Sequence, residues 1–167
     1  MSATAALDPL AALDTAPWQP RSIRLYRYWL SIHPAGGGLP GRQHFDPVAV
    51  PHMLPGLWLL DVQHEPFRLR YRLVGTGIVE AIGHEVTGQW LDEAHPHIRG
   101  NREFIERYEQ AATTGTPSWR KGKPRLWAHK DYRTIENLLL PFARDGRVVD
   151  MLAAFTVLYR PDGSVAY

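Results

Sequence analysis

Two closely spaced glycines, Gly75 and Gly77, have the clearest potential for chemistry, because they follow a strand-like run. A strand that leads through Gly-x-Gly into a helix forms the first half of a dinucleotide-binding fingerprint, in which a third glycine allows close helix packing. Glu80 occupies the third position. A carboxylate there would repel a pyrophosphate, and no parallel strand–helix–strand unit follows. We therefore expect these glycines to form turns for short helices rather than a phosphate site.

The eight histidines raise the question of a metal site. His95 and His97 are close in sequence, and His44 and His52 precede them. Zinc ligands are held on ordered elements at helical or strand spacing. These histidines show no such spacing and have no evident carboxylate partner. We expect solvated loop histidines and no metal site.

Signatures of catalysis are missing from the sequence. It contains no Gly-x-Ser-x-Gly elbow, no P-loop and no kinase motif. Asp92 and Glu93 are adjacent acids, but neighbouring residues on a helix point about 100° apart, so we expect them on a solvated face. The sequence predicts no catalytic residue and no enzyme.

Composition excludes several other classes of site and partner. The chain has no cysteine, so disulfides, thiolate metal sites and thiol nucleophiles are ruled out. Its net charge is only +2 and its basic residues are dispersed, which argues against nucleic-acid binding. The N-terminus lacks the pattern of a signal peptide, and no run approaches the ~20 apolar residues that span a bilayer. We expect a cytoplasmic protein with neither nucleic acid nor membrane as a partner.

Four segments follow from the order of patterns along the chain. We expect a weakly ordered leader at 1–20, a helix and proline-rich connector at 21–56, a core at 57–160 and a tail at 161–167. The helix, residues 21–33, is amphipathic. Its apolar stripe consists of Leu25, Tyr26, Trp29 and Leu30.

The core begins with strand patterns, continues with helix patterns and ends with strand patterns. Residues 57–62 and 67–74 predict a hairpin, and a short helix at 78–82 is closed by Gly83. Residues 101–114 predict a longer helix, with Glu103 and Arg107 in the favourable order for an ion pair on its exposed face. Three strand patterns follow, at 119–130, 133–142 and 147–159. This order indicates an α+β fold, with a five-stranded antiparallel sheet that carries short helices and one longer helix on one face.

The same order resembles a PAS domain, and the stretch GTGIVEAIGHEVTGQWLDE occupies the place of the PAS helical segment. Over residues 22–160 the chain is similar to a bacterial family of single-domain PAS proteins, usually encoded by alphaproteobacteria and mostly uncharacterised. The matching pieces are Tyr28-Trp29, Pro40-x-Arg42, Asp46-Pro47, Leu54-Pro55, Tyr71-Arg72-Leu73-x-Gly75-Thr76 and Thr87-Gly88.

The resemblance implies a sensory or protein-interaction module. We expect it to lack an output domain of its own, because 167 residues leave no room for one, and to signal through a separate partner. It also implies that the N-terminal stripe either covers its own sheet or packs against a second copy. Leu25, Tyr26, Trp29 and Leu30 are thus the candidate interface of a homodimer.

Two cofactors that PAS domains carry are disfavoured by the sequence. Asn101 stands where some members have the haem-binding histidine, and without cysteine no cysteinyl–flavin adduct forms. A metabolite or a non-covalent flavin stays as an alternative, held in a cavity between helices and sheet. That space is either a ligand pocket or a filled core. Its expected lining is Ile78, Ile82, Trp90, Ile105, Tyr108, Trp127, Leu139 and Phe155.

Overall fold

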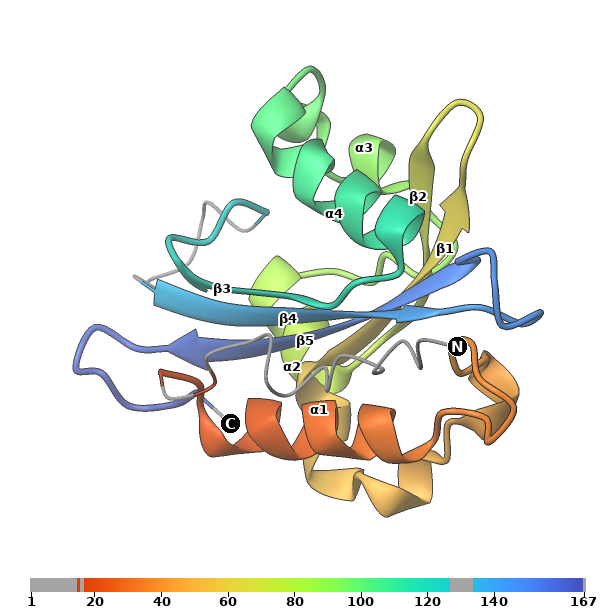
Figure 1. The fold of residues 1–167 in the computed structure, drawn as a ribbon. Coiled ribbons are helices and arrows are strands. Elements are labelled where there is room, and N and C mark those ends of the chain that lie inside the picture. Colours follow the sequence, from red (N-terminus) through yellow and green to blue (C-terminus); the bar gives the residue numbers. More distant parts are fainter. Residues whose placement is uncertain (1–14, 16, 127–133, 167) are drawn as a thin grey trace.

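A five-stranded sheet separates two layers of helices (Figure 1). The computed structural model describes residue 15, residues 17–126 and residues 134–166. The strands lie in the order β2-β1-β5-β4-β3, and every neighbouring pair is antiparallel. Their bounds are Leu57–Gln63 for β1, Arg68–Val74 for β2, Ser118–Gly122 for β3, Thr134–Phe142 for β4 and Met151–Tyr159 for β5. The predicted α+β fold with its antiparallel sheet is confirmed.

The helices are short except at two places. The α-helices are α1 at Pro20–Ser31, α2 at Thr76–Ile82, α3 at Leu91–Ala94 and α4 at Arg102–Thr114. Short 3-10 helices are η1 at Arg42–His44, η2 at Pro47–Ala49, η3 at Pro51–Gly56 and η4 at Pro96–Ile98. In the described part of the chain, no helix combines the length and the apolar character that crossing a bilayer requires.

Local side-chain chemistry sets where these helices begin and end. The Asn101 side chain accepts a hydrogen bond from the Phe104 N–H at 3.1 Å, which caps the start of α4. Asp46 caps η2 in the same way, through the Val48 N–H at 2.9 Å. Gly83 ends α2 at a φ of 93°, a left-handed conformation that suits glycine. The sequence predicted the Asp46 and Gly83 signals.

Both faces of the sheet are buried. Side chains alternate along a strand, so Leu139 of β4 faces α4 while Leu138 and Leu140 face α1. The face that meets α4 is called the helix-side face, and the face that meets α1 is called the α1-side face. All three leucines are at most 1% exposed. Each face therefore needs a covering layer of helix.

The α1 helix covers the outer face of its own sheet. Leu25, Tyr26 and Trp29 are buried there, and the Trp29 indole N–H donates to the Pro141 carbonyl at 3.0 Å. Leu30 is half-buried at the margin. The sequence left two roles open for this stripe, to cover its own sheet or to pack against a second copy. In the structure the stripe covers its own sheet.

Two predicted strands are longer in the sequence pattern than in the structure. β5 begins at Met151 because the Asp145 carboxylate accepts the N–H groups of Arg147 and Val148, which keeps the preceding residues in a turn. β3 ends at Gly122, whereas the pattern ran to residue 130. Residues 127–133 lie outside the described residues.

Gly75 is a point of close backbone approach. Its φ of −64° is open to any residue, so conformation alone does not require glycine. A Cβ at this position, however, would lie 2.2 Å from the Leu54 carbonyl oxygen, 2.5 Å from that of Pro55 and 2.7 Å from that of Leu57. The glycine turn before α2 therefore serves packing against η3.

We expect Gly75→Ala to destabilise the fold by about 3 kcal/mol, because three backbone carbonyls would have to move. Gly36→Ala is the matched control, since a Cβ there meets nothing within 4 Å. Urea unfolding of both variants measures the difference. Equal stability of the two variants would contradict the close approach.

Candidate functional site

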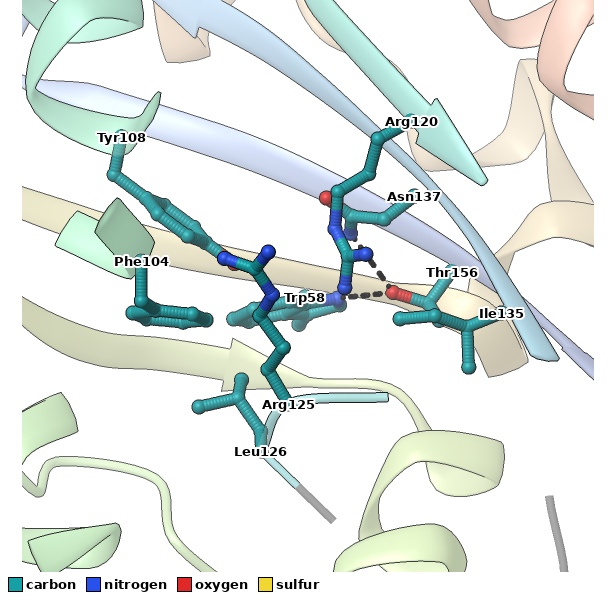
Figure 2. Close-up of a pocket in the computed structure, with 9 residues that line it drawn as sticks. All are labelled: Trp58, Phe104, Tyr108, Arg120, Arg125, Leu126, Ile135, Asn137 and Thr156. Carbon is teal, nitrogen blue, oxygen red and sulfur yellow. Dashed lines mark hydrogen bonds between the residues drawn. The ribbon is translucent and has the colours of Figure 1, made fainter. Parts of the chain in front are cut away.

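A small pocket lies between the helix-side face of the sheet, α4 and the segment after β3 (Figure 2). Its apolar wall is formed by Trp58, Phe104, Tyr108, Leu126 and Ile135. Its polar wall is formed by Arg120, Arg125, Asn137 and Thr156. The cavity measures about 10 Å³, which is room for one water-sized body.

A chain of hydrogen bonds fixes the polar wall. The Thr156 hydroxyl oxygen accepts from the Trp58 indole N–H and from the Asn137 amide, both at 3.0 Å. Asn137 Oδ1 in turn accepts from Arg107 Nη1 at 2.6 Å. These partners come from β1, β4, β5 and α4, so the network joins four elements across the helix-side core.

The Arg107 guanidinium extends this network to β3. Its Nη2 donates to the carbonyl oxygens of Ser118 at 2.8 Å and Asn137 at 3.0 Å, and its Nε donates to the Ser118 hydroxyl at 2.8 Å. The planar donor fork thereby locks α4 onto the edge of the sheet.

The pocket is electrostatically positive. Burial lowers the pKa of Arg107 to about 10, and burial also lowers the pKa of Arg120. Among the described residues, neither guanidinium has a carboxylate partner, whereas Arg125 pairs with Glu103 at 2.7 Å. Burial raises the pKa of the Tyr108 hydroxyl, and the three arginines oppose that rise.

The predicted cavity lining is brought together only in part. Tyr108 lines the pocket, and Ile78 and Leu139 are buried in the same helix-side core. Ile82 and Ile105 are half-buried at its margin.

Two further predicted lining residues lie away from this core, and a third falls outside the described residues. Phe155 lies on the α1-side face, because its neighbours Ala154 and Thr156 occupy the helix side and side chains alternate. Trp90 lies outside this space, with the Arg68 guanidinium 4.2 Å from its ring centre. Trp127 lies outside the described residues.

The polar members of the pocket are absent from the predicted lining. Glu103 and Arg107 were expected to pair on the exposed face of α4, but Glu103 binds Arg125 while Arg107 turns to the sheet. The sequence contains one signal for these polar pocket residues, because Asn137 and Thr156 interrupt strands that are otherwise apolar.

His95 corrects the expectation of solvated loop histidines. It is 4% exposed, and its Nε2 lies 2.8 Å from the Tyr71 hydroxyl oxygen. Burial lowers its pKa to about 4, and the positive charges of His97 and His84 add to this effect. The described residues contain no cluster of three or more metal-ligating side chains. His95 therefore acts as a neutral hydrogen-bonding partner within the fold.

Asp92 and Glu93 converge on a cation rather than standing free. Arg68 Nη2 lies 2.9 Å from the Asp92 carboxylate and 2.8 Å from that of Glu93. The two carboxylates are 35% and 51% exposed, and both are engaged by the same guanidinium. This arrangement ties α3 to β2 and does not resemble an acid–base pair.

A family model described as PAS domain matches residues 18–156. That range covers more than half of the chain and agrees with the sheet and helices described above. The chain belongs to the PAS domain family. A comparison with curated proteins found no match. PAS domains are in general sensory or interaction modules and are typically non-catalytic.

The residues of this PAS domain do not fit a haem bound through α4. Asn101 stands at the position expected for the ligand, and its side-chain oxygen is already used as the cap of α4. No histidine lies within Arg102–Thr114. The pocket is also far below the ~300 Å³ from which small-molecule sites begin. A flavin would need this core to repack.

We expect His95 to make stability fall as the pH is lowered from 6.5 to about 4. In the unfolded chain this histidine takes up a proton near pH 6.5, while in the fold it stays neutral until about pH 4. Its contribution is therefore complete above pH 6.5 and is lost below it, by about 2 kcal/mol after solvent screening.

Urea unfolding of His95→Gln at pH 7 and pH 4.5 measures this loss, since glutamine keeps a hydrogen-bonding side chain but does not titrate. The exposed His52 provides the control, and His52→Gln should keep the wild-type slope. A His95→Gln variant with the wild-type pH dependence would show that His95 is not responsible.

Proposed function

We propose that this PAS domain is a non-catalytic sensory module in which β4 couples the helix-side pocket to α1. The observation that carries the proposal is the position of two neighbouring residues. Glu136 and Asn137 follow each other in β4, so their side chains leave opposite faces of the sheet. One holds the start of α1, and the other holds Arg107 at the pocket.

On the α1 side, Glu136 is fully buried, and its two carboxylate oxygens accept the Gln19 N–H at 2.9 and 3.1 Å. Gln19 is the N-cap of α1, and its side chain accepts from the Arg21 N–H at 2.6 Å. The Tyr159 hydroxyl also donates to Glu136, at 3.4 Å. The first turn of α1 therefore depends on one buried carboxylate of β4.

On the helix side, the Asn137 side chain accepts from Arg107 through Oδ1 and donates to Thr156 through Nδ2. Asn137 lines the pocket, so a molecule that enters it would displace the Asn137 side chain and its bond to Arg107. The adjoining peptide carries Glu136, so the displacement would reach the contact with Gln19. This route supplies the two-state element that a sensor requires, namely α1 held or released.

The output signal would pass to another protein molecule that binds this domain. PAS domains often form dimers or bind partner proteins, and we propose a homodimer that signals through a separate partner. Because α1 packs Leu25, Tyr26 and Trp29 against its own sheet, these residues would reach a second copy only on release of the helix. As part of the same proposal the protein works in the cytoplasm, where the lack of cysteine makes it indifferent to thiol redox state.

Hydrogen exchange measures the coupling directly. We expect Asn137→Ala to speed exchange in the first turn of α1 more than the loss of global stability explains. Leu139→Ala is the matched control, because Leu139 lies two residues along on the same face of β4 but outside the polar network. Identical α1 profiles in the two variants, after correction for global stability, would refute the coupling.

Native mass spectrometry of freshly purified protein tests the assembly and the ligand in one measurement. The expected result is a dimer that carries a non-covalent mass. A monomer at micromolar concentration would contradict the homodimer, and a dimer without added mass would leave protein interaction as the function.

A further inference from the structure

Two arginine side chains line one small space on the helix-side face, and a third lies behind its wall. Arg120 and Arg125 line the pocket, and Figure 2 shows both guanidinium groups turned into it beside Trp58. Arg107 lies behind Asn137, to which its Nη1 donates. Aromatic rings of Tyr108 and Phe104 close the other side. The charged groups are thus held against a largely apolar wall.

The positive charge of this space is only partly balanced within the described residues. Glu103 pairs with Arg125 from the exposed side of α4, at 2.7 Å. Among the described residues, the pocket lining contains no acidic side chain. Withdrawing a guanidinium from water is costly unless an opposite charge accompanies it. A counter-charge from outside the chain would remove this cost.

Donors are available to receive such a charge. A guanidinium has five N–H groups. Among the described residues, Arg120 uses Nη2 for the Lys123 carbonyl at 3.1 Å, and no other hydrogen bond from its side chain is present. In contrast, Arg107 donates its hydrogen bonds to Ser118 and Asn137. Arg120 is therefore the group that can donate directly to a bound anion, and Arg107 contributes only its positive electrostatic potential.

We propose that this pocket binds a compact monoanion, either an inorganic ion such as chloride or the carboxylate group of a small acid, with Arg120 as its principal donor. The inference rests on the proposed sensory function and names the class of its ligand. Size decides between anions, because a cavity of about 10 Å³ admits one water-sized group, which can be a chloride ion or a single carboxylate oxygen whose acid stays outside the cavity. A sulfate, a phosphate or a nucleotide would force α4 away from the sheet.

Isothermal titration calorimetry with the full chain in anion-poor buffer tests the proposal. Sodium chloride, sodium acetate and sodium sulfate serve as probes at matched ionic strength. We expect saturable binding of chloride, acetate or both, and about tenfold or greater weakening in Arg120→Gln. Binding of chloride alone identifies an inorganic ion, and binding of acetate alone identifies a carboxylate group.

Arg102→Gln is the matched control, because its side chain is 79% exposed on the same helix as Arg107. It should bind like the wild type. Thermal unfolding shows that each variant is folded, and Arg120→Gln should be at least as stable as the wild type in anion-poor buffer because it removes a partly buried charge.

Three results would overturn the proposal: no saturable binding, equal binding by wild type and Arg120→Gln, or binding of sulfate alone. The hydrogen-exchange readout separates this outcome from the fate of the proposed function. Anion binding without a change in α1 exchange would keep the anion site and refute the coupling. The reverse pattern, an α1 response in Asn137→Ala without anion binding, would keep the coupling and refute the anion site.

Discussion

Strands β4 and β5 carry apolar side chains on both faces, and the rest of the structure depends on the need to cover both. A strand with Leu138 on one side and Leu139 on the other cannot leave either face in water. Helices α2 to α4 cover one face, and α1 with its 3-10 turns covers the other (Figure 1). The N-terminal helix is thus part of the domain core and not an appendage to it.

Polar residues inside this double core are costly unless each is satisfied. Thr156, Asn137 and Arg107 meet that condition by bonding to one another and to Trp58 and Ser118. Hydrophobic residues of similar volume would often be equally or more stabilising at such positions. The hydrogen bonds of this network are satisfied, yet cationic groups remain beside a cavity. A functional role explains this arrangement better than a contribution to stability does.

The sequence predicts the elements well because their signals are local. Alternation identifies the strands, and the Gly83 and Asp46 caps identify helix boundaries without knowledge of the fold. The site is harder to predict because its members meet only through tertiary packing. When both faces of a strand are apolar, alternation does not say which face meets α4, and Phe155 was therefore assigned to the wrong layer. His95 is buried because β2 brings Tyr71 beside it, a contact between residues 24 positions apart.

The pairing of β1 with β5 has a consequence for how the chain is made. Leu57 pairs with Phe155, so the central strand β5 and its neighbour β1 come from opposite ends of the domain. During synthesis the β1–β2 hairpin emerges early, but one edge of β1 has no strand beside it until β5 has left the ribosome. An open apolar edge is a site of aggregation. The nascent domain therefore passes through a long interval in which a chaperone can bind the exposed edge of β1. The sheet is complete only when β5, its last strand, has been synthesised.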